Sequence, residues 1–295
     1  VGLDDPVSKY LPLFSERDKD GVTLRHLLTH SSGLKPWRAY HELLREKERK
    51  TGEQLLATPA AREIVIDRVL RSGLVHEPGA AAVYGDLDFI VLGAVVEAVA
   101  RRGLDAFCRE RIFAPLGMRD TFFAPLSDGD GLTESVRRRV AATENCPWRE
   151  RVLWGEAHDP NAWAMGGVAG HAGLFASADD VMRFAQVILD VWHARSDALP
   201  RELLRSFAER QELPPGSDWA LGWDTPTQAA SSSGRHFSPR SIGHLGFTGT
   251  SLWIDLEREA VVVMLTNRVH QVAKKSRFDL RPVVHDLILE AFAAG

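Results

Sequence analysis

The amino-acid sequence predicts an α+β fold that combines a mostly helical part with an antiparallel sheet and flanking helices. Helical spacing of apolar residues dominates the chain as far as Arg195, most clearly at 86–102. The strongest strand pattern lies at 243–266, where two apolar runs flank a short turn at 256–259. An apolar-striped segment at 281–294 predicts a closing helix. Because the helices precede the strands, a parallel array of alternating strands and helices is not expected.

Five further helices are predicted from apolar spacing and end signals, at 22–30, 41–56, 61–72, 106–113 and 178–195. Ser177 is expected to cap the last of them, because its hydroxyl can accept a hydrogen bond from a backbone N–H group of the first turn. The alternation at 219–224 predicts a strand. Between 124 and 168 the periodic pattern is lost, which is typical of a long functional loop.

The composition is that of a globular protein and argues against two classes of partner. Of the 295 residues, 44% are hydrophobic and 26% are charged, which permits a substantial core. A net charge of −4 gives no basic surface, so no nucleic-acid partner is expected. The longest apolar run, 89–100, contains Glu97 and is too short to span a bilayer, so no membrane span is expected. The two cysteines, Cys108 and Cys146, are too few for a disulfide framework.

Ser32 and Lys35 form the only S-x-x-K in the chain, a spacing that can mark an acyl-transferring serine and its lysine. Such a serine is expected at the start of a helix, where N–H groups favour an oxyanion. Ser32 instead follows the helix predicted at 22–30, and Gly33 is a poor helix former. Pro36 moves Lys35 out of the α-helical region, so its ammonium is not expected one turn from the hydroxyl. We therefore predict that Ser32 belongs to a helix C-terminal turn and is not a nucleophile.

His26 and His30 lie one helical turn apart, a spacing that can chelate zinc. The metalloprotease motif H-E-x-x-H also needs a glutamate directly after the first histidine, and Leu27 occupies that position. A zinc hydrolase is therefore a minor alternative, and neither a metal nor an organic cofactor is expected.

Several segments together resemble the serine β-lactamase-related family, which includes AmpC-type β-lactamases, D,D-peptidases and family esterases. The segment VTLRHLLTHSSGL closely resembles a hallmark of this family, and DDPVSKYLP resembles the loop that follows its nucleophile helix. Three later segments resemble the family's Tyr-x-Asn segment, the helix after a glycine turn, and the third motif, Lys-Thr-Gly or His-x-Gly. These are VYGDLDFIVLGAVVEAVA, GLFASADDVMRFAQ and GHLGFTGTSLWID. Each motif alone is weak, but their common order makes the resemblance specific over essentially the whole chain.

The resemblance implies a β-lactamase/transpeptidase-like fold in one domain, residues 1–295. It implies a mostly helical lobe at 1–175, a lobe of sheet and helices at 176–295, and an active site between them. The family's S-x-x-K helix and first strands would precede Val1, and the chain begins without an initiator Met or a signal peptide. We therefore expect a segment that lacks its nucleophile, with a true pseudoenzyme as the alternative.

By resemblance, Tyr84 is the family's catalytic tyrosine, whose phenol beside a lysine can act as general base and then as acid. A buried tyrosine before a helix is the structural alternative. Asp86 stands where the family has Asn and is expected to bind substrate, although an ionised carboxylate only accepts hydrogen bonds. It would bind a carbonyl poorly unless protonated, and it could instead pair with the lysine or cap the helix that begins at Leu87.

By resemblance, His244 and Gly246 form the family's His-x-Gly motif. His244 is assigned a catalytic role, because it can donate a hydrogen bond to a substrate carboxylate or to Tyr84; a surface strand residue is the alternative. Gly246 is expected to let the substrate backbone approach the strand edge, and the Phe247 N–H is expected to be one oxyanion donor. Leu245 replaces a common Thr, which removes one hydroxyl contact.

His171 lies in the glycine-rich segment GGVAGHAG, where the family often places residues that shape the substrate site. It is therefore assigned to substrate binding, and His158, Asp159 and Trp163 are loosely assigned to the same rim. A turn histidine bonded to the backbone is the structural alternative.

Together these assignments indicate a serine hydrolase that acts on an ester, amide or β-lactam through an acyl-enzyme, with a small-molecule or peptidoglycan-like substrate. His-x-Gly in place of Lys-Thr-Gly favours an esterase or peptidase over a dedicated antibiotic hydrolase. This chain alone is expected to hydrolyse little or nothing. The alternative is a non-catalytic peptide or glycan binder with the same fold. The sequence leaves open the exact substrate, the oligomeric state and the choice between periplasm and cytoplasm.

Overall fold

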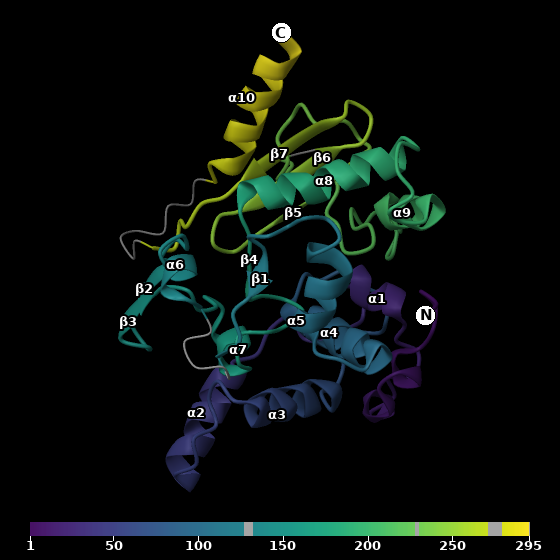
Figure 1. Ribbon diagram of the computed structural model, residues 1–295. Coiled ribbons are helices and arrows are strands. Elements are labelled where there is room, and N and C mark those ends of the chain that lie inside the picture. Colours follow the sequence, from purple (N-terminus) through teal and green to yellow (C-terminus); the bar gives the residue numbers. More distant parts are fainter. Residues whose placement is uncertain (127–131, 228–229, 271–278, 295) are drawn as a thin grey trace. The chain divides into compact units, whose positions relative to one another are not determined.

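The computed structural model describes residues 1–126, 132–227, 230–270 and 279–294 (Figure 1). The chain divides into two compact units, each built from several stretches of sequence. Unit 1 comprises Val1–Pro115, Thr121–Ala142 and Leu153–Phe175. Unit 2 comprises Leu116–Asp120, Thr143–Val152 and Ala176–Gly295.

Unit 1 is mostly helical. Its helical elements are two short 3-10 segments, Val7–Lys9 and Pro12–Ser15, then α1 (Leu24–Leu28), α2 (Tyr40–Thr51), α3 (Pro59–Leu70), α4 (Asp86–Ala100), α5 (Leu104–Cys108) with a π-helical turn at Arg109–Phe113, α6 (Glu134–Arg137) and α7 (Pro160–Ala164). Strands β1 (Phe122–Phe123) and β4 (Leu174–Phe175) pair antiparallel. Thr23, Thr58 and Asp159 cap α1, α3 and α7, because each side chain accepts a hydrogen bond from an N–H group of the first turn.

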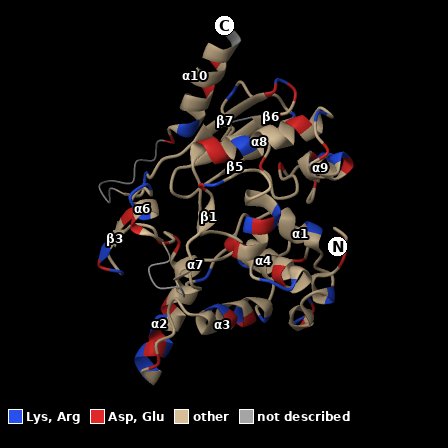
Figure 2. Cartoon of the chain, viewed as in Figure 1, with Lys and Arg blue, Asp and Glu red and all other residues tan. Residues whose placement is uncertain are grey.

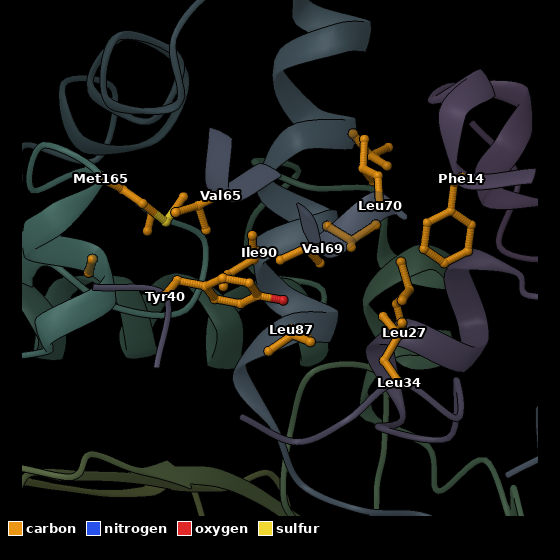
Figure 3. Packing of buried hydrophobic residues seen from close by; sticks show 14 of the residues in the cluster. Phe14, Leu27, Leu34, Tyr40, Val65, Val69, Leu70, Leu87, Ile90 and Met165 are labelled. Carbon is orange, nitrogen blue, oxygen red and sulfur yellow. The ribbon is translucent and has the colours of Figure 1, made fainter. Parts of the chain in front are cut away.

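The core of unit 1 surrounds α4, whose sequence is apolar on nearly every side. Leu87 and Ile90 of α4 share one buried cluster with Val65 and Val69 of α3 and with Leu27 of α1 (Figure 3). Because both neighbouring helices pack against α4, the beginning of this helix is held firmly.

Helix α2 contrasts with α4 because most of its residues are charged. Acidic and basic side chains alternate along it, and Glu46 pairs with Lys50 four residues later at 2.6 Å. Figure 2 shows both signs of charge interspersed on this helix. Its buried residues, Tyr40, His41 and Leu44, all lie in the first two turns, so the remainder of α2 is solvated.

Unit 2 contains an antiparallel sheet with helices on both faces. Its described elements are β2 (Glu144–Cys146), which pairs with β3 (Arg151–Leu153), then α8 (Ala178–Trp192), α9 (Arg201–Ala208), β5 (Ser241–Leu245), β6 (Ser251–Asp255), β7 (Ala260–Met264) and α10 (Arg281–Ala294). Strands β5, β6 and β7 lie side by side in that order. The Ser177 hydroxyl accepts a hydrogen bond from the Asp180 N–H, which confirms the predicted cap of α8.

Alternation along the strands separates the two faces of this sheet. Ile242 of β5 and Ile254 of β6 face α8 and share a buried cluster with its apolar side. Trp253 of β6 faces the other way and packs with Leu289 of α10. Figure 1 shows α8 lying across the sheet.

Most of the predicted helices are confirmed with shifted ends, but two strand predictions are wrong. Residues 219–224 form no strand, and Asp224 makes an isolated bridge with Gly243 instead. The run 243–255 is interrupted, because a turn divides it into β5 and β6. Gly249 in this turn has a φ of 104°, which glycine adopts at little cost.

The segment predicted to be irregular contains α6, β2, β3 and α7, while residues 127–131 lie outside the described residues. The two strands have three residues each and the two helices four and five, too short to leave a periodic pattern. In the described part of the chain, none of the helices is both long enough and apolar enough to cross a bilayer.

A buried lysine holds the end of α3. Lys19 has no exposed surface, and its Nζ donates to the carbonyl oxygens of Leu70 and Ser72, the latter at 2.7 Å. These carbonyls lie where α3 ends, and a helix end leaves such groups without partners inside the helix. The ammonium lies 4.7 Å from the centre of the Phe14 ring. Burial, with a smaller contribution from Arg17, lowers the pKa of Lys19 to about 8.

Lys19→Met is expected to destabilise the protein, because two buried carbonyls lose their donor. Each unsatisfied buried group costs roughly 1–3 kcal/mol, so urea unfolding should show a loss in that range or above. Lys9→Met removes an exposed pair with Asp5 and is the matched control, with an unfolding midpoint close to that of the wild type. Equal effects of the two substitutions would contradict the capping role of Lys19.

The same variant has an expected pH dependence. An unfolded lysine titrates near about 10.4, so between about pH 8 and pH 10 the unfolded chain binds more protons than the folded chain. The stability that Lys19 contributes therefore rises with pH through this window. The difference in unfolding free energy between wild type and Lys19→Met should widen there, and a narrowing would show that the folded protein prefers the ammonium form.

Candidate active site

Loop residues 30–36, called the clamp below, hold both ends of a turn at the start of α4. The N–H groups of Val83 and Asp86 donate to the carbonyls of His30 and Pro36, each at 2.8 Å. The backbone between these contacts, which carries the predicted catalytic tyrosine, is therefore fixed on both sides.

Two glycines permit this close approach of backbones. Gly33 has a φ of 85°, and a Cβ at this position would overlap the carbonyl oxygen of His76. A Cβ at Gly85 would overlap the backbone of Pro36. Gly33, which the sequence analysis described as a poor helix former after the predicted helix at 22–30, therefore also makes the clamp possible.

A buried polar cluster fastens the clamp to α4. The Ser32 hydroxyl donates to one carboxylate oxygen of Asp88, and His30 Nδ1 lies 3.3 Å from the other. Asp88 is 4% exposed, and burial raises the pKa of its carboxyl although both partners favour the ionised form. Ser32 Oγ in turn accepts a hydrogen bond from the Leu34 N–H at 3.0 Å. Because a buried carboxylate is costly without partners, the cluster favours a single arrangement of the loop.

Ser32 therefore has a structural role in this cluster, and that it is not a nucleophile stays a prediction. It lies beyond the end of α1, its side chain is buried, and its hydroxyl hydrogen is directed at Asp88. Lys35 lies on the exposed part of the clamp, outside any helix.

The two histidines considered for zinc have separate structural roles. His26 Nδ1 accepts a hydrogen bond from the Thr23 N–H at 3.1 Å, as part of the capping of α1. His30 faces Asp88 and the turn before α4. The contacts of these two histidines do not support the zinc-hydrolase alternative, which stays a minor prediction.

Tyr84 is presented at the surface by this buried support. Its side chain is 55% exposed, which does not fit a core tyrosine, and its ring centre lies 4.8 Å from that of His30. Partial burial, followed by the negative charge of Asp86, raises the pKa of the phenol. The described surroundings therefore keep the phenol protonated, and a general-base role requires a cation beside it.

Asp86, Asp159 and His171 gather in the same unit, with one potential ligand atom from each lying within 4.8 Å of the others. His171 Nε2 lies 3.0 Å from Asp159 Oδ1, and this imidazole is 3% exposed. Although burial acts against it, the bond from His171 lowers the pKa of Asp159. Burial raises the pKa of Asp86, with His171 opposing and Asp159 adding to the shift. Asp86 therefore takes up a proton more readily than an ordinary Asp, while Asp159 stays ionised.

Two structural alternatives are wrong at these positions. Gly85 is the N-cap of α4, and Asp86 is the first residue of the helix. His171 is bonded to a carboxylate and not to the backbone. Asp86, Asp159 and His171 are also the described residues that could hold a cation. The hydrogen bond between Asp159 and His171 explains why those two groups lie close together without a cation.

The predicted residues of unit 2 lie at the end of β5 and in the turn after it. His244 Nδ1 lies 2.9 Å from the Leu245 carbonyl oxygen, so this nitrogen carries a hydrogen and donates it to the carbonyl. The Trp219 ring centre lies 5.9 Å from that of His244. Phe247 is exposed. The strand alternation places His244 on the same face as Ile242, toward α8.

Two glycines shape this end of the sheet. Gly243 is paired with Trp253, and a Cβ there would overlap the indole. A Cβ at Gly246 would overlap the side chain of Thr250 across the turn. Gly246 is therefore required by the turn itself, besides the role expected toward a substrate.

The predicted site residues thus fall into two groups. Tyr84, Asp86 and His171 belong to unit 1, and His244, Gly246 and Phe247 belong to unit 2. Sequence reasoning missed the role of Asp88, although a signal existed: a carboxylate inside the apolar run of α4. The contact of Asp159 with His171 had no comparable signal, because the two positions are twelve apart in a stretch whose sequence shows no periodic pattern.

A family comparison accounts for the order of these motifs. Residues 1–284 match the family model described as Beta-lactamase. The chain belongs to the Beta-lactamase family. A "Putative D-alanyl-D-alanine carboxypeptidase" of Salmonella agona is 29% identical over 288 residues, which covers 92% of this chain and 64% of the relative. The chain therefore spans somewhat less than two thirds of that relative's length.

Solved structures of low sequence identity share the fold of this Beta-lactamase family chain. The octameric penicillin-binding protein homologue from Pyrococcus abyssi has a TM-score of 0.66 at 20% identity, covering 100% of this chain and 60% of the other. EstCE1, a hydrolase with promiscuous acyltransferase activity, has a TM-score of 0.61 at 22% identity, covering 97% and 78%. The predicted β-lactamase/transpeptidase fold and the family resemblance are thereby confirmed.

Ser32→Ala is expected to lower the free energy of unfolding by roughly 1–3 kcal/mol, because buried Asp88 loses a donor. The same change in an Asp88→Asn background should cost less, since hydrogen bonds to a charged acceptor are the stronger ones. Urea unfolding of the four proteins measures this coupling. Equal costs in both backgrounds would show that Ser32 does not act through Asp88.

Proposed function

We propose that the protein is a serine acyl hydrolase that works through an acyl-enzyme, with Tyr84 as the proton carrier. One observation carries the proposal: a half-exposed phenol is held on a buried polar support, in a chain that matches the Beta-lactamase family over residues 1–284. General acid–base groups need this combination of a fixed position and access to a substrate.

The nucleophile in this proposal is a serine outside these 295 residues. The S-x-x-K serine of this chain, Ser32, is buried against Asp88 and has no lysine one helical turn away. Burial, followed by Asp86, raises the pKa of Tyr84. In the proposed mechanism a neighbouring ammonium supplies the opposite influence, as a lysine three residues after the serine would.

The reaction then runs in two balanced halves. The serine oxygen attacks the acyl carbon while its proton passes to the Tyr84 oxygen, and the Phe247 N–H helps to stabilise the oxyanion. Tyr84 returns the proton to the leaving alcohol or amine, and the acyl-enzyme forms. Water repeats the sequence by the same route and releases the acid and the serine.

Four further side chains and backbone positions are proposed to bind the substrate. Asp86, when protonated, donates to a substrate carbonyl, and burial favours that protonated form. His244 donates to a substrate carboxylate, Gly246 leaves room beside the strand, and His171 shapes the rim near Asp86.

The favoured substrate is a peptide or ester with a nearby carboxylate. The Salmonella relative, named as a carboxypeptidase, supports a peptide, and EstCE1, described as a hydrolase, leaves room for an ester. A binder that turns nothing over is the alternative, and the labelling experiment below distinguishes it.

Fluorophosphonate labelling of the intact protein as encoded, followed by peptide mapping, is expected to modify a serine outside residues 1–295. The 295-residue chain alone should stay unlabelled, and Ser32→Ala should not change the labelling of the intact protein. A label on Ser32 would overturn the assignment of the nucleophile. An intact protein that binds peptides but is never labelled would be the non-catalytic binder.

Tyr84→Phe in the intact protein is expected to slow acylation by about 10²–10⁴-fold, the range of general acid–base catalysis. Because the ring and its contact with His30 stay in place, the unfolding midpoint should change little. Tyr10→Phe, which removes a hydroxyl bonded to Asp5, is the matched control and should leave the acylation rate as it is. A wild-type rate in Tyr84→Phe would exclude the phenol as proton carrier.

A further inference from the structure

A buried arginine at the start of α10 contacts the turn that carries Gly246 and Phe247. Arg281 Nη1 donates to the carbonyl oxygens of Gly246, at 3.1 Å, and Thr250, at 3.2 Å. The Arg281 side chain is 7% exposed. One guanidinium nitrogen thus joins the two ends of the turn between β5 and β6.

Asp279 fixes the orientation of this guanidinium. Arg281 Nε donates to Asp279 Oδ1 at 2.9 Å and Nη2 donates to Oδ2 at 2.6 Å, so the two planar groups pair side by side. The Arg281 N–H also donates to Asp279 Oδ1 at 3.1 Å. The remaining Nη1 is then aimed in one direction, toward the turn.

A second anchor lies one helical turn further along α10. His285 Nδ1 lies 3.1 Å from the Ser233 carbonyl, so that nitrogen carries the hydrogen and Nε2 accepts from the Ser251 hydroxyl at 2.9 Å. Ser251 is the first residue of β6, directly after the turn. Helix α10 therefore holds the turn through Arg281 and the following strand through His285.

The Arg281 contact acts on one particular peptide group. The carbonyl of Gly246 and the N–H of Phe247 belong to the same planar trans unit, in which they point in opposite directions. Fixing the direction of that carbonyl therefore fixes the direction of the N–H. A cationic donor on the carbonyl oxygen also polarises the amide, which strengthens its N–H as a donor.

We propose that Arg281 is a positioning residue that orients and polarises the Gly246–Phe247 peptide for oxyanion stabilisation. The proposal rests on the proposed function, in which the Phe247 N–H is an oxyanion donor. Arg281 acts through the backbone and does not touch the reacting atoms. The arginine fork is essential, because one lysine ammonium cannot both pair with Asp279 in this geometry and reach two carbonyls.

The chain offers a matched control on the neighbouring peptide. Arg268 Nε donates to the carbonyl oxygen of Phe247 at 3.1 Å, which belongs to the next peptide unit of the same turn. The Arg268 backbone N–H keeps its own bond to Thr248 at 2.8 Å in any side-chain variant. Arg268→Ala therefore removes an arginine from the turn without releasing the Gly246 carbonyl.

The experiment compares Arg281→Lys, Asp279→Asn and Arg268→Ala in the intact protein. Full loss of an oxyanion donor costs about 10²–10³ in kcat, so Arg281→Lys should lower kcat and the fluorophosphonate rate at least about tenfold, with KM nearly unchanged. Asp279→Asn should act in the same direction more weakly, and Arg268→Ala should stay near the wild type. Equal losses in Arg268→Ala and Arg281→Lys would overturn the proposal.

The ¹H and ¹⁵N shifts of the Phe247 amide give a reading that does not depend on activity. They should move in Arg281→Lys and in Asp279→Asn, while the Phe247 signal of Arg268→Ala should move less. An unmoved Phe247 amide in Arg281→Lys would overturn the proposal even if the rate falls. If the wild type is never labelled, the proposed function fails and the oxyanion role with it, whereas the amide shifts still decide whether Arg281 orients the peptide. Should Arg281→Lys fail to fold, the kinetic rate and the Phe247 amide shift of Asp279→Asn decide the proposal instead.

Discussion

The buried carboxylate of Asp88 is the constraint on which the helical unit depends. A carboxylate removed from water must be surrounded by donors, and here the donors come from a loop more than fifty residues earlier in the chain. Supplying hydrogen-bond donors to the Asp88 carboxylate therefore brings the loop to the start of α4. The backbone bonds from this loop then fix the turn that carries Tyr84. The position of one exposed phenol follows from one buried charge.

In unit 2, a charged side chain also contacts the backbone beside the predicted site residues. Two backbone bonds close the turn between β5 and β6, from the Gly246 N–H to the Thr250 carbonyl at 2.8 Å and from the Gly249 N–H to the Gly246 carbonyl at 3.0 Å. A charged side chain from the start of α10 completes the turn from outside, so the C-terminal helix serves as more than a cover for the apolar face. In both units a buried ionic group contacts the backbone or its supporting loop beside the predicted site residues, in addition to apolar packing and backbone hydrogen bonds.

The sequence predicted the fold class and most helices, because long amphipathic or apolar segments and capping residues such as Ser177 are local signals. It could not predict the break at 246–250, since strand-forming residues on both sides conceal a turn that depends on Gly249 and on Arg281. The tyrosine turn was found through motif order. The residues that hold that turn were not found. Asp88 contacts Ser32 and His30 only in the folded structure, and a single sequence does not show which distant residues come into contact.

The lack of a side chain at Gly243 affects more than its contact with Trp253. The indole of Trp253 lies against the strand where this residue has no side chain, so β5 has almost no tolerance for added volume on that face. Its neighbour His244 projects from the opposite face of the same backbone. Any enlargement at position 243 would push the strand and carry the imidazole with it. The position of the imidazole to which the proposed function assigns substrate binding therefore depends on a residue that faces the other side of the strand.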